Sequence, residues 1–94
     1  MNKYETIFLI SNKITKEDKE KVVNKIKKYL SKNGKIIKTD DLGTKKLAYE
    51  IKKHNVADYY LIVFECDADK ILELERLYRI TEEILKFIVV RKDD

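Results

Sequence analysis

Tyr59-Tyr60-Leu61-Ile62-Val63-Phe64-Glu65-Cys66 carries apolar side chains at both odd and even positions. Successive side chains of a β-strand point to opposite faces, so such a segment is expected in the interior of a sheet. Lys3 to Ile10, before it, and Lys86 to Lys92, after it, are also rich in β-branched and aromatic residues. The sequence therefore predicts these three segments as strands, apolar on both faces.

Amphipathic segments lie between these strands. From Lys16 to about Lys32, and again after Asp67, apolar residues recur at the spacing of one helical face. Thr15 with Asp18 resembles a capping box, and Asp67 is expected to cap the second helix. The first helix should end at Asn33-Gly34, with glycine in the left-handed conformation.

A further strand is expected between the first helix and Tyr59. It starts at Lys35 to Lys38, bends or bulges at 40–43 and resumes from Lys45 to Ile51, before a polar loop at 52–58. With 81–85 as a connection, the order is βαββαβ. That order favours a ferredoxin-like α+β sandwich, with two helices on one face of a four-stranded antiparallel sheet.

Composition limits the class of protein. The chain has 94 residues, 44% of them hydrophobic and 40% charged, and its net charge is +4. We expect a single domain over residues 1–94, because neither proline nor a flexible linker is present. One cysteine, no long apolar run and no signal-like N-terminus predict a cytoplasmic protein without a membrane span. The last residues, 92–94, are expected to fray.

The strands carry more apolar side chains than two short helices can cover. An open antiparallel sheet normally has one polar face, so a second apolar face indicates a partner surface. The alternative is that the central strands are simply apolar. We assign the following residues to a face that meets a partner protein: Ile7, Leu9, Tyr59, Leu61, Val63, Ile88 and Val90.

No pattern of catalytic residues is present. His54 is the only histidine and lies in a polar segment, whereas Cys66 ends a strand, where a small buried hydrophobe is common. Asp40-Asp41 and Glu82-Glu83 fit a turn and a connection better than an acid/base pair. We therefore expect no enzyme activity, no catalytic residue, no metal and no cofactor, and neither a membrane nor a small-molecule substrate as partner.

Basic residues outnumber acidic ones by 21 to 17, a weak preference for anionic partners. Lysines of the first helix alternate with acids near its start, which is typical of a solvated face. Basic residues at strand ends are better placed to contact phosphates. Tyr4, Tyr49 and Tyr59 are candidates for base stacking, although the sequence signature of the RNA recognition motif is missing.

Leu42-Gly43-Thr44-Lys45-Lys46-Leu47-Ala48-Tyr49-Glu50-Ile51 resembles the signature of the bacterial ribosomal small-subunit protein six family. The family pattern is an aromatic residue or leucine, then Gly, any residue, two basic residues, Leu, Ala, Tyr, any residue and Ile. The start, Lys3-Tyr4-Glu5-Thr6, and the segments Tyr59-Tyr60-Leu61 and Ile88-Val89-Val90-Arg91 match the family in type and position. The resemblance covers nearly the whole chain.

The resemblance implies a structural protein of the ribosome. Such a protein would bind the central domain of small-subunit ribosomal RNA as a heterodimer with ribosomal protein eighteen of the small subunit. Leu42 and Thr81 depart from side chains found in many members, which implies greater dependence on the partner. Carried over by position, the RNA contacts would be Lys3, Tyr4, Lys45, Lys46, Arg79, Lys86 and Arg91.

Two other classes share this fold. A regulatory module that binds a small effector or dimerises through its sheet fits the same pattern, because fold alone does not determine function. An acylphosphatase-type enzyme needs an anion-cradling loop with Gly and Arg after the first strand. Residues 11–15 read Ser-Asn-Lys-Ile-Thr, which disfavours that class.

Overall fold

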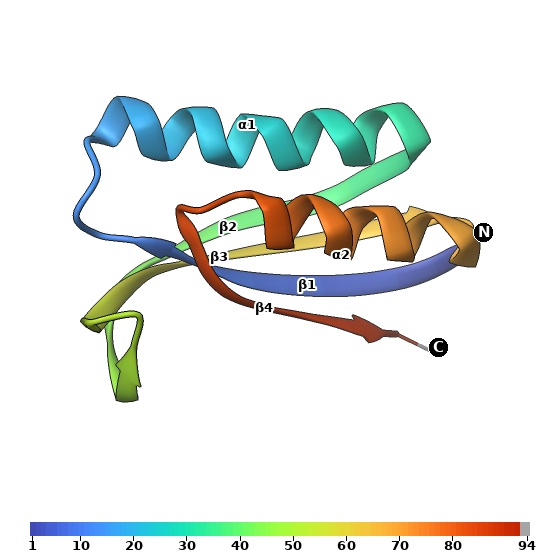
Figure 1. Cartoon of the computed structure of the whole chain (residues 1–94). Helices are drawn as coiled ribbons and strands as arrows, with labels where there is room; N and C mark the ends of the chain where they lie inside the picture. The colour runs from blue at the N-terminus through green and yellow to red at the C-terminus, as the bar shows by residue number, and fades with distance from the viewer. Residues whose placement is uncertain (93–94) are drawn as a thin grey trace.

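A computed structural model of the chain describes residues 1–92. Its elements are β1 (Asn2–Ser11), α1 (Lys16–Asn33), β2 (Gly34–Ile51), β3 (His54–Cys66), the 3-10 turn η1 (Ala68–Lys70), α2 (Ile71–Ile80) and β4 (Ile84–Arg91). The strands form one sheet in the order β2-β3-β1-β4, with every neighbouring pair antiparallel. Both helices lie on the same side of this sheet (Figure 1). The predicted ferredoxin-like fold is confirmed.

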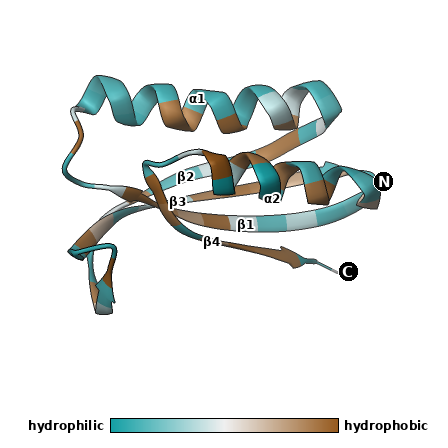
Figure 2. Cartoon of the chain, in the orientation of Figure 1, coloured by the Kyte–Doolittle hydropathy of each residue, from teal (hydrophilic) through white to brown (hydrophobic). Residues whose placement is uncertain are grey.

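The main core lies between the helices and the sheet. Phe8, Ile62 and Phe64 point from the central strands into this layer and are fully buried. Ile26 and Leu74 meet them from α1 and α2. Outside this layer the helices are largely hydrophilic, whereas β3 and β4 carry long hydrophobic stretches and β2 is mixed (Figure 2). Burial of the apolar stripe of each helix, rather than helix propensity, therefore holds the layers together.

The start of α1 follows the prediction but its end does not. Thr15 Oγ1 accepts a hydrogen bond from the backbone N–H of Asp18 at 3.1 Å, as expected of an N-cap. Gly34 is extended, with φ −175°, so the prediction of a left-handed glycine at this position is wrong. It is the first residue of β2, and a Cβ there would collide with the carbonyl oxygen of Glu65. Close approach of two strands, not a helix cap, requires glycine at this position.

Three expected boundaries also change. The predicted loop at 52–58 is only a two-residue turn, Lys52-Lys53, with φ 47° and 64°, and β3 begins at His54. Positive φ at both central positions suits the twist of a tight hairpin, but the usual Asn-Gly signal is absent. Asp67 makes no side-chain capping bond, because η1 intervenes before α2. β4 begins at Ile84 instead of Lys86.

The bulge expected in the second strand is confirmed. Strand β2 is continuous, and its register with β3 shifts between Asp41 and Gly43. Gly43 has φ 81°, and its N–H donates to Asp41 Oδ1 at 2.9 Å. At the other end of the chain, the N–H of Lys92 donates to the carbonyl of Lys3 at 2.8 Å, so Lys92 continues the pairing. Asp93 and Asp94, expected to fray, lie outside the described residues.

Candidate RNA and partner-protein interface

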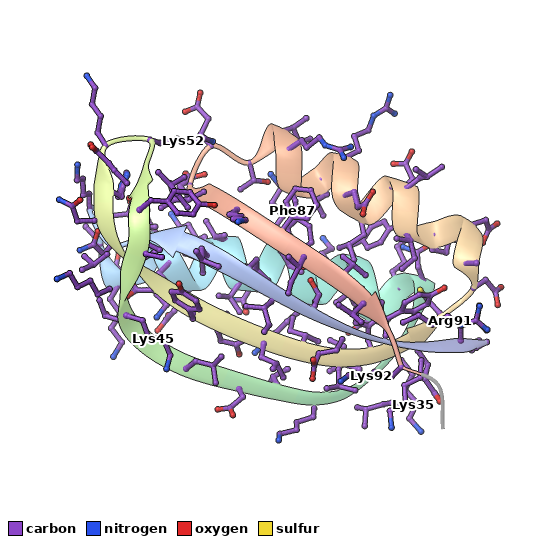
Figure 3. All side chains as sticks on the ribbon, turned by 90° about the horizontal axis from the view of Figure 1, so that it is seen from below. Lys35, Lys45, Lys52, Phe87, Arg91 and Lys92 are labelled. Atoms are coloured by element: carbon purple, nitrogen blue, oxygen red, sulfur yellow. The ribbon has the colours of Figure 1, made fainter. Side chains whose placement is uncertain are left out.

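All seven side chains assigned to a partner have the strand parity opposite to that of the main core, so they lie on the sheet face away from the helices, which we call the open face. Figure 3 views the sheet from this side. Strand pairing places Ile7 opposite Leu61 of β3 and opposite Ile88 of β4, an apolar row across three strands. The two neighbouring rows hold Val63, Glu5 and Val90 on one side, and Tyr59, Leu9 and Lys86 on the other. Ile88 and Val90 are 47% and 46% exposed. The open face is thus apolar at its centre and unpartnered within the described chain.

The hairpin formed by the end of β2 and the start of β3, residues 44–57, extends past the sheet and bends toward the open face (Figure 1). We call it the arm. Leu47 of the arm packs with Leu9, Ala57 and Leu85 in a second small core and is buried. The arm therefore covers one end of the open face. The alternation of Leu47, Tyr49 and Ile51 indicated a strand but was not assigned to the partner face.

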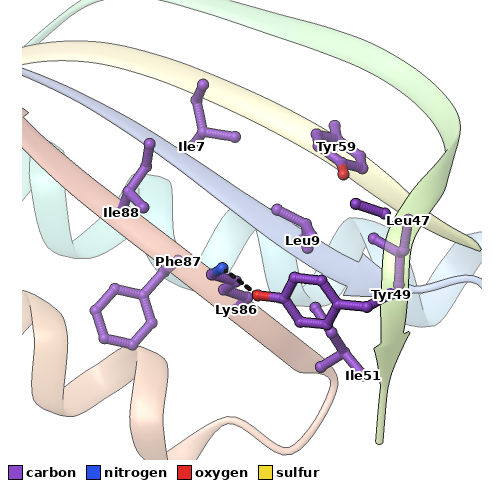
Figure 4. A pocket seen from close by; sticks show the side chains of 10 residues that line it. Ile7, Leu9, Leu47, Tyr49, Ile51, Tyr59, Lys86, Phe87 and Ile88 are labelled. Carbon is purple, nitrogen blue, oxygen red and sulfur yellow. Dashed lines mark hydrogen bonds between the residues drawn. The ribbon is translucent and has the colours of Figure 1, made fainter. Parts of the chain in front are cut away.

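A hollow of about 270 Å³ lies between the arm and β4 (Figure 4). Ile7, Leu9, Tyr59 and Ile88 line its sheet side, and Leu47, Tyr49 and Ile51 line its arm side. Lys86 contributes the charged group. Because the lining is almost entirely apolar and the hollow is open to solvent, it suits an apolar side chain of a partner.

Lys86 and Tyr49 bridge this hollow. The Nζ atom of Lys86 donates to the Tyr49 hydroxyl at 3.0 Å and lies 5.5 Å from the centroid of that ring. The hydrogen bond to Tyr49 raises the pKa of the exposed Lys86 ammonium, which favours its charged form. Tyr49 is 63% exposed, so its ring presents a free face. Of the three tyrosines considered for stacking, Tyr49 is the best placed.

His54, directly after the turn of the arm, fastens the arm to the end of β1. Its Nε2 lies 2.7 Å from Ser11 Oγ, and its Nδ1 lies 2.8 Å from the carbonyl oxygen of Lys52. Lys13 Nζ donates to the carbonyl of Lys53 at 3.1 Å. His54 was expected to be a solvated loop residue; the structure instead gives it a fastening contact between β1 and the arm turn.

Cations expected to contact RNA gather at the arm end of the sheet. Lys45 and Lys46 are exposed on the arm. Arg79, in the last turn of α2, lies over the Phe87 ring at 5.6 Å and reaches the edge strand β4. There it lines a hollow of about 310 Å³ with Lys52 and Lys86. Lys52 was left out of the expected RNA contacts because the length of the arm was not foreseen.

The other two cations, Lys3 and Arg91, lie at the far end of the sheet, where Figure 3 shows Arg91 near Lys35. Lys3 of β1 and Lys35 of β2 both pair opposite Glu65. Arg91 donates from Nη2 to Asn2 Oδ1 at 3.1 Å. Arg91 lies five positions beyond Lys86 in β4, about 17 Å in an extended chain. The expected RNA contacts therefore form two groups at opposite ends of the sheet.

Tyr4 belongs to neither group. It is only 7% exposed, and its ring stacks on Phe64 with centroids 5.6 Å apart. A strand tyrosine of this parity faces the helices, so its ring is not accessible to a base. The expectation that Tyr4 contributes stacking to an RNA site is wrong, because the family position carries a core side chain here.

The remaining candidate groups have structural surroundings. Cys66 is 2% exposed in the main core, and burial raises the pKa of its thiol. Asp41 forms an ion pair with Lys19 of α1 at 3.2 Å. Within residues 1–92, no group of three or more His, Cys, Asp or Glu side chains is placed to hold a metal ion. The described helices include none long and apolar enough to span a membrane.

Comparison with known proteins identifies the family. A family model described as Ribosomal protein S6 matches residues 3–91. The chain belongs to the ribosomal protein S6 family. In this S6-family chain, the Gly-x-basic-basic-Leu-Ala-Tyr run that carried the resemblance begins at Gly43, directly before the arm, and continues along it.

Relatives named Small ribosomal subunit protein bS6 match this chain over nearly its whole length. That of Helicobacter acinonychis is 42% identical, covering 99% of this chain and 66% of the relative. That of Thermotoga maritima is 41% identical, covering 97% and 73%. The crystal structure of 30S ribosomal protein S6 from Thermotoga maritima superposes with a TM-score of 0.92 at 40% identity, covering 97% of this chain and 87% of that one. The chain thus spans about two thirds to three quarters of the two relatives' length.

Proposed function

We propose that the chain is a structural constituent of the small ribosomal subunit, and hence cytoplasmic. It binds the central domain of small-subunit ribosomal RNA as a heterodimer with ribosomal protein eighteen. The small-subunit names of its S6 relatives support the first statement. The observation that carries the second is the apolar centre of the open face, together with the expected cations at both ends of the sheet.

The apolar centre is the surface for the partner protein. Side chains that are nearly half exposed, such as Ile88 and Val90, lose unfavourable contact with water when a protein covers them. The hollow beside the arm offers a place for one apolar anchor of the partner. The proposed contact set is Ile7, Tyr59, Leu61, Val63, Ile88 and Val90. Leu9, which was expected in this set, is only 8% exposed because it packs in the second small core, so a partner reaches it only through the hollow that it lines.

The cations are the surface for RNA. Lysine and arginine contacts to phosphates fix the orientation of a protein on RNA without reading its sequence. Lys52, Arg79 and Lys86 line one hollow, so their positive charges gather at one edge of the sheet. The proposed contact set is Lys3, Lys45, Lys46, Lys52, Arg79, Lys86 and Arg91. Tyr49, not Tyr4, is the aromatic side chain available beside them.

Assembly, not catalysis, is the proposed role. The only histidine fastens the arm, and the only cysteine is buried in the main core. Neither group faces the hollow beside the arm. These surroundings support a scaffold that holds RNA and protein together, with no chemical step and no cofactor.

A salt series tests this proposal. Binding to a central-domain RNA fragment is measured with and without the candidate partner protein. If four to six phosphates are neutralised, the logarithm of the affinity falls against the logarithm of salt concentration with a slope of about −4 to −5. Lys45→Gln with Lys46→Gln should flatten the slope by about 2. A matched variant, Lys16→Gln with Lys27→Gln, removes the same charge from α1 and should leave the slope unchanged.

The competing function is a homodimeric regulatory module that binds a small effector. The open face would suit a second copy as well as another protein, and the hollow of about 270 Å³ approaches the lower size of ligand pockets. Analytical ultracentrifugation separates the two functions. A stable homodimer that ignores both the RNA fragment and the partner would overturn the ribosomal proposal and favour the regulatory one.

A further inference from the structure

A second basic surface lies on the helix layer, away from the candidate interface. Residues 21–39 contain no aspartate or glutamate but seven lysines: Lys21, Lys25, Lys27, Lys28, Lys32, Lys35 and Lys38. Four of them, Lys21, Lys25, Lys28 and Lys32, recur at spacings of four, three and four on α1. At 3.6 residues per turn they fall within an arc of roughly 60°. We call these four residues the lysine stripe.

The lysine stripe has no counter-charge of its own. All four side chains are exposed, and within residues 1–92 none makes an ion pair or a side-chain hydrogen bond. Lys19, elsewhere on the same helix, lies 3.2 Å from Asp41 and 3.8 Å from Asp58. The helix can therefore pair its lysines where acids are within reach. Asp18 and Glu83 line a groove with Lys21 and Lys25 but form no ion pair with them, so Lys28 and Lys32 are the least compensated.

A solvated helix face usually mixes both signs of charge. Acids of α1 are confined to its start, at Glu17, Asp18 and Glu20, where they suit the helix dipole. Beyond them, lysines three and four residues apart repel one another and weaken the helix. A polyanion relieves that repulsion and releases its own counterions on binding. A single-sign stripe is thus better explained by an anionic partner than by solvation.

We propose that the lysine stripe binds the phosphate backbone of an RNA duplex, as a second RNA site. Tyr29, the aromatic residue beside the stripe, is half-buried and donates its hydroxyl to the carbonyl of Lys70 at 2.7 Å. No exposed ring of α1 is therefore available to stack on an unpaired base. Lysine ammonium groups without aromatic neighbours contact phosphates, which a duplex presents regardless of sequence.

The position of the stripe allows two RNA segments to bind at once. It lies on the helix layer, whereas the candidate interface uses the open face and the arm on the other side of the sheet (Figure 1). The inference rests on the proposed function: a protein that holds ribosomal RNA with the cations of the candidate interface holds a second segment with α1. Its effect would be to join two RNA helices across the thickness of the protein.

The test compares two double variants of the full chain. Lys28→Gln with Lys32→Gln removes two charges from the stripe, and Lys16→Gln with Lys27→Gln removes two from the opposite flank of α1, beside Tyr60. Glutamine keeps helix propensity, and circular dichroism verifies that both variants fold. Binding to a short RNA duplex of arbitrary sequence is measured across a salt series. We expect the stripe variant alone to flatten the salt slope, by about 2.

Equal effects of the two double variants would overturn the stripe as a site and leave a general charge effect. Loss of duplex binding only in Lys45→Gln with Lys46→Gln would place all RNA binding at the candidate interface. In either case binding to the central-domain fragment with the partner still tests the proposed function separately. Vesicles of anionic phospholipid serve as a further probe. If the stripe variant loses vesicle binding but keeps duplex binding, the partner is a membrane and the RNA proposal is wrong.

Discussion

The two faces of the sheet are built from the same strands but differ in what covers them. On the helix-covered face, Phe8, Ile62 and Phe64 are fully buried. On the open face, Ile88 and Val90 remain nearly half exposed, although they are equally apolar. The difference shows that apolar composition alone does not measure stability. Side chains of one face are buried by folding, whereas those of the other are only partly covered and are the ones that we propose meet a partner.

The two faces also differ in how polar groups are treated. On the covered face, the single hydroxyl of Thr6 donates to the carbonyl of Ile88 at 2.8 Å, so the Tyr78 hydroxyl, also 2.8 Å away, donates to Thr6. Burial raises the pKa of Tyr78 and keeps it protonated. On the open face, Glu5 instead forms an ion pair with Lys92 at 3.4 Å. Interior polar groups need a partner inside the protein, whereas open-face ones also meet water.

The largest expected effect compares Phe8→Ala with Ile88→Ala. Phe8→Ala leaves a cavity in the main core and should lower the free energy of unfolding by about 3–5 kcal/mol. Ile88→Ala removes a side chain that is already 47% exposed and should cost about 1 kcal/mol or less. Urea denaturation measures both. Equal losses would mean that the open face is part of the folding core.

A smaller effect is expected from the buried hydroxyl pair. Thr6→Val keeps the shape but leaves the Tyr78 hydroxyl without its acceptor, which should cost about 1–3 kcal/mol. Tyr78→Phe removes that hydroxyl while Thr6 keeps its bond to the Ile88 carbonyl, so it should cost less. Thermal unfolding of the two variants ranks them. If Tyr78→Phe instead cost more than Thr6→Val, the Tyr78 hydroxyl itself would contribute more to the free energy of unfolding than the Thr6 oxygen that accepts its hydrogen bond.

On the open face, Ile88→Asp should affect binding more than folding. A carboxylate at the centre of the apolar row must lose its water when the partner covers it, which should weaken partner binding about tenfold, or about 1.4 kcal/mol. Isothermal titration with the candidate partner measures the change, and Leu72→Asp, on the exposed side of α2, is the control. Unchanged affinity in Ile88→Asp would remove this row from the interface.

The smallest effect is expected from Tyr49→Phe. Lys86 is fully exposed, so losing its hydrogen bond should leave the unfolding midpoint at neutral pH unchanged. Because the folded-state pKa of Lys86 is raised, its contribution is complete below the ordinary lysine pKa and is lost only as pH rises through the raised value. Any difference between variant and parent should therefore narrow in strongly alkaline solution. A difference confined to acidic pH would contradict the assignment of Lys86 to this contact.

Much of the fold followed from local patterns. The Thr15 cap, the helical stripes and the bulge before Gly43 depend on neighbouring residues, and each was predicted. The arm turn at Lys52-Lys53 was missed because these residues adopt positive φ without the glycine that usually marks such a turn. Gly34 was given the wrong reason, since the backbone that crowds it lies on β3, thirty-one residues farther along at Glu65.

The candidate site was predictable in part. Alternation placed the seven apolar residues of the open face on one parity, and the strand-end lysines followed from position along the chain. The inclusion of Tyr4 was wrong, because a family position does not state which way a ring points. Lys52 was missed because only the folded arm brings it near Arg79.

The sequence by itself determined the order of strands and helices, the presence of two apolar parities and the family. These depend on periodicity and on short motifs, which are properties of contiguous residues. The tertiary structure alone decided that the helices cover the parity of Phe8 and leave that of Ile88 open, and that the arm bends over one end of the sheet. The physical reason is that both faces of an apolar strand are equivalent within the strand itself. Only the packing of helices, through contacts between residues distant in sequence, buries one face and leaves the other open.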